Sequence, residues 1–306
     1  MDDFEGFGLP EWATTHYFTH HSPSSITRPD DLEFFEKTHL RPNKIWVPFG
    51  CPAKAGIAVH DYVTDILTKD MDAAEAYRSA VAKFDEHKIL EHSDTDETKF
   101  HIIRDSIFEI PKTDPKISGT VFELTARHML EGVREATAGS NRIAEGRWAS
   151  AEFPGLSLPF KGQLDLEDPG VVEMKTKWPS MAANSKRGWN PASLPKRPDF
   201  NHVVQVAYYW HWLRQSSENV SVKIIYASCR GFKIFTNKEE PELSEANLSA
   251  ALDHLKKVAR KREKLMQVAS TKEELFELVT PDFSHFMWRD MRPVVGDEIK
   301  QVWGSK

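Results

Sequence analysis

The sequence predicts an α/β protein, with a central mixed sheet flanked by helices and a helical N-terminal elaboration. Three observations predict this class. Apolar residues three and four positions apart, among good helix formers, dominate residues 1–140. Runs rich in β-branched and aromatic residues, bounded by glycine and proline, follow in the αβ core at 145–236. Helical patterns return in 243–306. We expect all three parts to form one domain, 1–306.

The individual elements follow from spacing and from helix-breaking residues. Residues 1–30 are rich in His, Pro, Ser and Thr, and we expect them to be irregular. The helical patterns cover 53–69, 72–90, 94–112, 119–138, 201–214 and 243–268. Strands are expected around 145–153, in 220–228 and in 231–236, besides the hairpin described next.

A predicted hairpin carries the densest group of chemically active residues. Residues 163–166 form one strand, Asp168-Pro169-Gly170 is a typical turn, and 171–175 return. A turn about Pro169 places Asp165 opposite Glu173, about 5 Å apart at Cβ. Two facing carboxylates repel each other unless a cation lies between them. Lys175 projects from the same face as Glu173, so the hairpin suits a hard divalent cation and an activated water. An ordinary surface hairpin with solvated charges is the alternative.

The order of these residues resembles the PD-(D/E)xK nuclease superfamily, in particular its RecB-like exonuclease branch. The matching residues are Gly162, Asp165, Glu173-Met174-Lys175, and then Gln205 and Tyr209 in the pattern Gln-x-x-x-Tyr. The compact exonucleases of phages and of mitochondrial genome maintenance, which lack an iron–sulfur cluster, are the most similar. The resemblance implies a restriction-endonuclease-like fold. It also implies a metal-dependent deoxyribonuclease that hydrolyses phosphodiester bonds from DNA ends, typically of single strands.

Two other functions stay open at this point. The same active site also serves structure- or sequence-dependent DNA endonucleases, so action from the ends is implied by the resemblance alone. A catalytically inactive DNA-binding or recombination-partner module would keep the fold and lose an acid or the lysine. Asp165, Glu173 and Lys175 are all present, which favours an enzyme.

The resemblance also implies roles for individual residues. Asp165, Glu173 and the backbone carbonyl of Met174 would hold one or two Mg²⁺ or Mn²⁺ ions, and Lys175 would orient the water. In the branch, a histidine on an early helix is a further ligand, and Gly56-Ile-Ala-Val-His60 fits that pattern. Glu123, on the helix that starts after Gly119, is the alternative to His60. An imidazole ligand favours Mn²⁺ relative to an all-oxygen site.

A basic, tryptophan-containing segment leaves the hairpin directly after Lys175. Between Lys175 and Pro198 there are six basic residues and no acid. Basic segments with aromatic residues bind single strands through phosphates and stacked bases. The predicted DNA contacts are Lys177, Trp178, Lys186, Arg187, Trp189, Lys196, Arg197, Gln205 and Tyr209. Alternatively, the tryptophans pack inward, Tyr209 caps the core, and the lysines only solvate a loop. For a second basic run at 256–264, an exposed helix face is the favoured interpretation.

Composition limits the remaining possibilities. The chain has 306 residues, a net charge of −6 and two cysteines, Cys51 and Cys229, which excludes a four-cysteine iron–sulfur cluster within this chain. No run reaches the roughly 18 apolar residues of a membrane helix, and no signal-peptide pattern starts the chain. We expect an intracellular protein, in the cytoplasm, an organelle or a phage-infected cell. Its expected partners are DNA with free or single-stranded ends and a recombination or replication protein, and not a membrane.

Overall fold

A computed structural model describes residues 8–45, 51–86, 107, 119–140, 143–181, 189–190 and 192–304. The chain divides into two compact units. The first unit comprises 1–47, 148–162 and 249–306, and the second comprises 48–147 and 163–248. The first unit therefore combines segments from both ends of the chain with residues 148–162.

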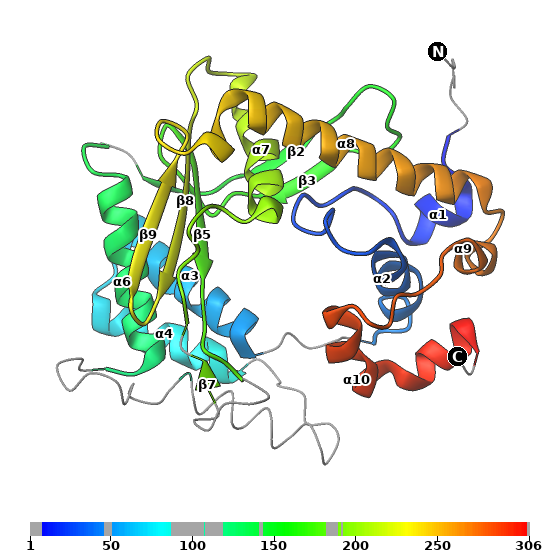
Figure 1. The fold of residues 1–306 in the computed structure, drawn as a ribbon, viewed down its shortest axis with the longest axis horizontal. Coiled ribbons are helices and arrows are strands. Elements are labelled where there is room, and N and C mark those ends of the chain that lie inside the picture. Colours follow the sequence, from blue (N-terminus) through cyan, green and yellow to red (C-terminus); the bar gives the residue numbers. More distant parts are fainter. Residues whose placement is uncertain are drawn as a thin grey trace. The chain divides into compact units, whose positions relative to one another are not determined.

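The second unit contains a five-stranded mixed sheet (Figure 1), with strand order β1-β4-β5-β8-β9. The strands are β1 (Ala144–Glu145), β4 (Leu166–Glu167), β5 (Gly170–Thr176), β8 (Ser221–Ser228) and β9 (Gly231–Thr236). Only β5 and β8 run parallel, and helix α7 (Phe200–Arg214) lies between them in the chain. A parallel pair needs such a crossover, whereas the antiparallel neighbours can be joined by short turns. The predicted α/β class with a mixed sheet flanked by helices is confirmed.

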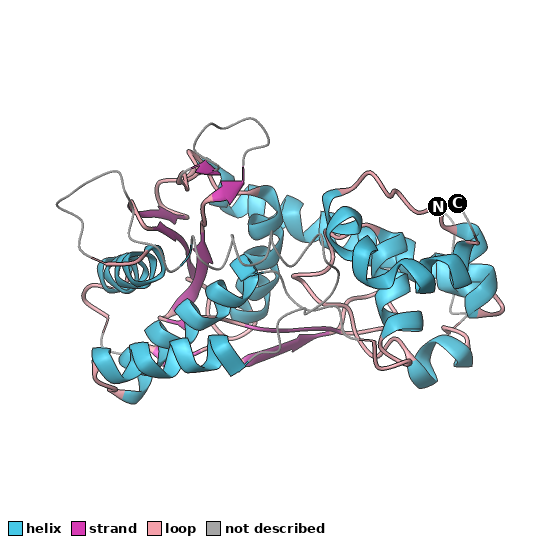
Figure 2. Ribbon diagram, turned by 90° about the horizontal axis from the view of Figure 1, so that it is seen from below, coloured by secondary structure: helices cyan, strands magenta, loops and turns pink. Residues whose placement is uncertain are grey.

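Helices cover the sheet on both sides (Figure 2). Helices α3 (Cys51–Lys69), α4 (Ala73–Glu86) and α6 (Val121–Ala136) share one buried apolar cluster with alternate residues of the central strands, such as Met174 and Ile225. On β5, Glu173 and Lys175 stand on either side of Met174 in the sequence. They project to the opposite face of the sheet because side chains alternate along a strand. Helix α7 contacts β5 and β8, and its Gln205 binds Lys175 on that face.

Local signals explain where these helices begin. The side chain of Thr120 accepts a hydrogen bond from the amide of Glu123 at the start of α6. The side chain of Asp199 does the same for Asn201 at the start of α7. Both are N-cap interactions, which satisfy amides that have no partner within the helix. The predicted helices over 53–69, 72–90, 119–138, 201–214 and 243–268 are present with shifted ends; the one over 94–112 lies outside the described residues except for Ile107.

Two predicted strands differ from the structure. The strand expected around 145–153 is divided into β1 and β2 (Trp148–Ala151). The strand expected at 163–166 is also interrupted, because β3 (Phe160–Gln163) pairs with β2 whereas β4 pairs with β1 and β5. Asp165 lies in the break between β3 and β4. A short pair, β6 (Ser180–Met181) and β7 (Trp189–Asn190), belongs to the basic segment.

The first unit is mainly helical. Its elements are α1 (Glu11–His16), α2 (Asp30–Phe35) with a following π-helical turn at Glu36–Leu40, the later part of α8 (Glu245–Val268), α9 (Lys272–Leu278) and α10 (Phe286–Trp303), with the β2–β3 pair. A short 3₁₀ turn, Pro241–Leu243, belongs to the second unit and comes directly before α8 in the chain. Helix α1 falls within residues 1–30, so the prediction of a wholly irregular start is wrong there. Trp288 is fully buried in the core of this unit.

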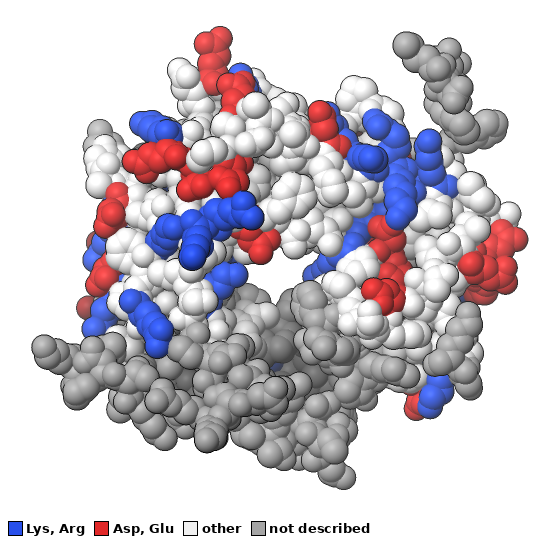
Figure 3. Space-filling view, in the orientation of Figure 1, with Lys and Arg blue, Asp and Glu red and all other residues white. Residues whose placement is uncertain are grey.

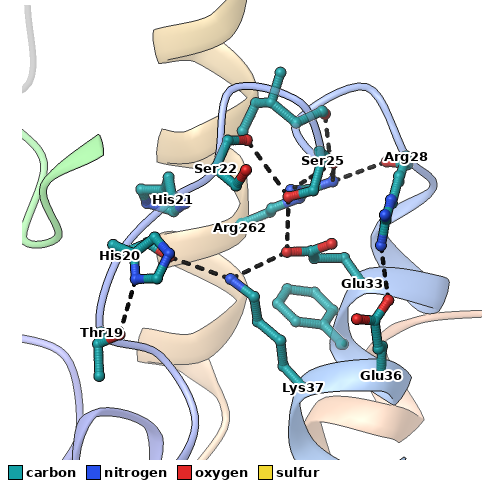
Figure 4. A network of polar contacts seen from close by, with 12 residues as sticks. Thr19, His20, His21, Ser22, Ser25, Arg28, Glu33, Glu36, Lys37 and Arg262 are labelled. Carbon is teal, nitrogen blue, oxygen red and sulfur yellow. Dashed lines mark hydrogen bonds and ion pairs between the residues drawn. The ribbon is translucent and has the colours of Figure 1, made fainter. Parts of the chain in front are cut away.

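Arg262 of α8 holds the N-terminal segment by buried polar contacts (Figure 4). Its guanidinium donates to the carbonyls of Ser25, Ile26 and Arg28 and pairs with Asp30 at 2.8 Å. Nearby, Glu33 accepts from Ser25 and pairs with Lys37 at 3.0 Å. Arg262 is only 2% exposed, so these contacts replace its lost hydration. None of the helices in the described part of the chain has the length and apolar character that crossing a membrane requires.

Candidate active site

The β4–β5 hairpin places the two predicted acids opposite each other. Leu166 pairs with Val172 and Glu167 with Val171, and extending this register by one residue sets Asp165 against Glu173. The turn is closed by a bond from the amide of Asp168 to the carbonyl of Gly170, at 3.2 Å. A side chain at Gly170 would overlap the backbone of Ser221, so a glycine is required where β5 meets β8.

Asp165 is held by a strand and by a helix. One carboxylate oxygen accepts from the amide of Met174 at 2.7 Å, and the other lies 3.5 Å from Nε2 of His60 on α3. Burial alone would raise the pKa of Asp165, but His60, Lys175 and the Met174 amide together hold it below its usual value. Asp165 is therefore an anion at neutral pH. The bond from the Met174 amide joins the break between β3 and β4 to the backbone of β5.

Glu173 is fully buried, and only one of its two carboxylate oxygens has a partner among the described residues. Its Oε1 lies 2.6 Å from Nζ of Lys175, whereas its Oε2 has no partner among the described residues. Burial, followed by the negative charge of Asp165, raises the pKa of Glu173 to about 7. A buried carboxylate oxygen without a partner is costly and indicates a missing cation, proton or water.

Lys175 links the hairpin to α7. Its ammonium group donates to Glu173 and, at 3.1 Å, to Oε1 of Gln205. Burial disfavours its charge, but Glu173 and Asp165 outweigh this and raise the pKa of Lys175. An ammonium group has three N–H bonds, and these two contacts leave one for another acceptor.

Gln205 and Tyr209 lie one turn apart on α7 and have different contacts. Gln205 orients Lys175, as described above. The Tyr209 hydroxyl donates to the carbonyl of Gln163 at 2.7 Å, and this bond ties α7 to the segment that leads into β4, within the second unit. Burial, followed by the charge of Glu173, raises the pKa of Tyr209. Tyr209 therefore makes a structural contact, in line with the alternative role left open by the sequence. It lies close enough to Glu173 for that charge to affect its pKa.

Of the two candidates for a further ligand, the structure brings His60 to Asp165. Burial disfavours the charge of His60, but ion pairs with Asp165 and Asp61 raise its pKa to about 10. Glu123 lies in the first turn of α6, pairs with Arg127 at 3.0 Å and is half exposed. Gly56, one turn before His60, allows α3 to approach β5, because a Cβ there would lie 2.9 Å from the Thr176 hydroxyl.

Sequence reasoning missed Tyr226 on β8, which pairs in register with Lys175. Its hydroxyl accepts from the amide of Asp199 at 3.0 Å and lies 2.6 Å from Nδ1 of His202. Either the hydroxyl or Nδ1 is the donor in this bond, depending on the tautomer of His202. Burial, and then the positive charge of Lys175, lower the pKa of His202 to about 3. Only the pairing of β5 with β8 reveals Tyr226, because no local motif contains it.

The residues of the basic segment have different surroundings in the structure. Lys177 lies over the ring of Tyr226, 5.4 Å from its centroid, beside the site. Trp178 stacks on Phe122 of α6 and donates to Thr176, which is the inward packing left open by the sequence. Lys196 and Arg197 are exposed. Lys186, Arg187 and the side chain of Trp189 lie outside the described residues.

The donor set fits a divalent cation, although the site is not preformed. Among the described residues, no three His, Cys, Asp or Glu side chains are arranged as a metal-binding group. Oε1 of Glu173 is paired with Lys175, and Asp165 contacts His60. However, a hard cation would satisfy two neighbouring carboxylates: the partly exposed Asp165, and the buried Glu173 with its raised pKa and unpartnered oxygen.

Comparison with protein-family models and with curated proteins finds no match to this sequence. Among solved structures, a protein from Eubacterium rectale described as a "putative exonuclease" is similar, with 14% sequence identity and a TM-score of 0.43. The similarity covers 94% of this chain and 92% of that one. Similarity at this level does not indicate an activity, so the function is inferred from the site.

Proposed function

We propose that the protein is a metal-dependent DNA exonuclease of the PD-(D/E)xK type, which hydrolyses phosphodiester bonds from DNA ends and prefers single strands. The observation that carries this proposal is the convergence of Asp165, Glu173 and Lys175 on one hairpin, with Gln205 of α7 bound to the lysine. The geometry supports hydrolysis of a phosphodiester. Action from ends, and on single strands, is supported by the resemblance of the ordered motif.

Asp165, Glu173 and the carbonyl of Met174 would hold Mg²⁺ or Mn²⁺, with His60 as a further ligand. When bound, the ion would lower the pKa of a water and neutralise negative charge on the phosphate. Lys175 would donate its remaining N–H to the water or to a phosphate oxygen, where charge develops in the transition state. Its raised pKa keeps it cationic at neutral pH, so it acts as a donor and not as a base.

The DNA strand would follow the basic segment beside this site. The proposed phosphate contacts are Lys177, Lys186, Arg187, Lys196 and Arg197, with Trp189 stacking on a base. Gln205 would act through Lys175. Tyr209 would position α7 through its bond to Gln163, and Trp178 would position the start of the basic segment through Phe122 and Thr176.

Cleavage of linear and of covalently circular single-stranded DNA tests the proposal. Each end of the linear strand is labelled separately, and reactions contain Mg²⁺, Mn²⁺ or EDTA. We expect metal-dependent loss of the linear strand alone, abolished in Asp165→Asn. Glu167→Gln is the matched control, because it makes the same chemical change two residues away in the same hairpin and should retain activity.

The other outcomes identify the alternative functions. Cutting of the circle would indicate a DNA endonuclease with the same active site. Binding of DNA without cleavage in either metal would indicate an inactive DNA-binding module. Cleavage that persists in EDTA and in Asp165→Asn would contradict the site itself.

A further inference from the structure

A hollow lies along helix α8 in the first unit, formed entirely by residues of α8 and α9. Its volume is about 380 Å³. Four basic residues of α8 line it: Lys257, Arg260, Lys261 and Lys264. Three aliphatic residues complete the lining: Leu265 and Val268 of α8 and Leu278 of α9. We call this the α8 hollow.

The basic residues form a stripe because they are spaced three and four apart on the helix. All four are exposed, and Figure 3 shows Lys and Arg side chains grouped over α8. Lys261 pairs with Asp30 at 2.7 Å. Neither Lys257 nor Arg260 has an acidic partner in the described part of the chain. The stripe therefore has positive charge available for an anionic ligand.

The aliphatic residues are unusual in their exposure. Val268 is 70% exposed and Leu278 is 46% exposed, and both belong to a small group of exposed large hydrophobic side chains among the described residues. Each ends its helix, so α8 and α9 bring them into the same hollow. Exposed apolar side chains within a hollow, rimmed by charge, are typical of a protein-binding site.

Nucleic acid satisfies only part of this surface. Single strands bind through cations and through aromatic side chains on which bases stack, and no aromatic residue lines the α8 hollow. Phosphates would leave Val268 and Leu278 exposed. A large apolar side chain flanked by carboxylates would bury the aliphatic residues and pair with the basic ones at the same time.

We propose that the α8 hollow binds an acidic segment of another protein, which inserts one large apolar side chain between Val268 and Leu278 and places carboxylates on Lys257 and Arg260. This inference is independent of the proposed nuclease activity, because it uses none of the residues of that site. The segment would act as an anchor that brings the protein to its partner.

Fluorescence anisotropy with a labelled 12-residue peptide, containing Asp and Glu around one central Phe, tests the proposal. We expect the full-length protein to bind this peptide about tenfold or more tightly than the same peptide with Ala in place of Phe. The double variant Lys257→Glu/Arg260→Glu and the variant Leu278→Ser should each weaken binding by about tenfold or more. Lys238→Glu, a single reversal of an exposed charge outside the hollow, should have no effect.

Val268→Ser repeats the test of the aliphatic side if Leu278→Ser alters folding, which circular dichroism monitors. Equal binding of the Phe and Ala peptides would overturn the proposal, as would equal binding by Leu278→Ser, Val268→Ser and the wild type. Tighter binding of a 12-nucleotide single strand, lost only in the charge variant, would assign the surface to nucleic acid instead. Absence of peptide binding at about 1 mM would also overturn it.

Discussion

At the scale of single residues, Glu173 controls how protons compete with a metal ion. Without metal, burial and the charge of Asp165 raise its pKa to about 7, so it is half protonated near neutral pH. A cation binds the deprotonated carboxylate, and protonation below pH 7 therefore opposes binding. We expect the apparent Mn²⁺ affinity to fall by at least about tenfold per pH unit between pH 7 and 5, measured by calorimetric titration.

The controls for this prediction are two acid-to-amide variants. Glu173→Gln should bind Mn²⁺ weakly at every pH, since it has lost the titrating ligand. Glu167→Gln should retain both the affinity and its pH dependence. A wild-type affinity that stays flat from pH 7 to 5 would contradict the role of Glu173.

His60 is predicted to exchange a proton for the metal at higher pH. Its ion pairs with Asp165 and Asp61 outweigh burial and raise its pKa to about 10, so it is protonated at pH 8. An imidazole that binds metal must be deprotonated. We expect about one proton to be released per Mn²⁺ bound at pH 8 by the wild type, and about none by His60→Asn. Calorimetry in buffers of different ionisation enthalpy measures this release; equal release by both proteins would exclude His60 as a ligand.

At the scale of elements, the contact of α3 with β5 decides where His60 lies. A Cβ on Gly56 would lie 2.9 Å from the hydroxyl of Thr176, which already accepts from Trp178. Gly56→Ala should therefore push α3 from the strand. We expect about 1–3 kcal/mol lower unfolding free energy in urea, together with about tenfold or more loss of DNA cleavage, because the ligand is displaced.

Gly132→Ala is the matched control for this variant. Gly132 of α6 packs against Ile225 and Phe232, and a Cβ there would lie 2.9 Å from Ile225. Overpacking at this position should cost a similar unfolding free energy, but the crowded side chains belong to β8 and β9 and not to the contact of α3 with β5. Equal loss of cleavage in Gly56→Ala and Gly132→Ala would show that general destabilisation, and not the position of α3, affects the site.

At the scale of the whole molecule, both ends of the chain contribute to the first unit, and Arg262 connects them. Removing its guanidinium leaves Asp30 and three backbone carbonyls without their buried donor. We expect Arg262→Ala to lower the unfolding free energy by about 3–5 kcal/mol, measured in urea by circular dichroism. Lys261→Ala breaks another contact with Asp30, but Lys261 is largely exposed, so its loss should cost less than about 1 kcal/mol. Similar losses in both variants would contradict this role of Arg262.

Several elements were predictable because their signals are local. Asp199 caps α7, which was predicted over 201–214 and is observed at Phe200–Arg214. The strands predicted at 220–228 and 231–236 match β8 and β9 within one residue. The turn at Asp168-Pro169-Gly170 sets the register of the hairpin, and side chains alternate along a strand, so Asp165 and Glu173 could be predicted to oppose each other.

Other features depend on contacts between segments that are distant in the sequence. The break at Asp165 arises because β3 and β4 pair with different partners. Trp178 packs on α6, and Tyr226 comes beside Lys175 only through the parallel pairing of β5 and β8. Contacts between distant segments also group both ends of the chain with residues 148–162 in the first unit. No local sequence pattern predicts any of these contacts.

The sequence by itself determined the α/β class, the hairpin that opposes two acids and the order of residues that resembles a nuclease. These depend on turn chemistry, on helix caps and on periods of two and 3.6 residues, all of which act over a few neighbouring positions. Only the tertiary structure decided that His60, and not Glu123, meets Asp165, and that one oxygen of Glu173 is buried without a partner among the described residues. Packing decides these points, because the approach of a helix to a sheet and the burial of a charge depend on the whole set of surrounding side chains.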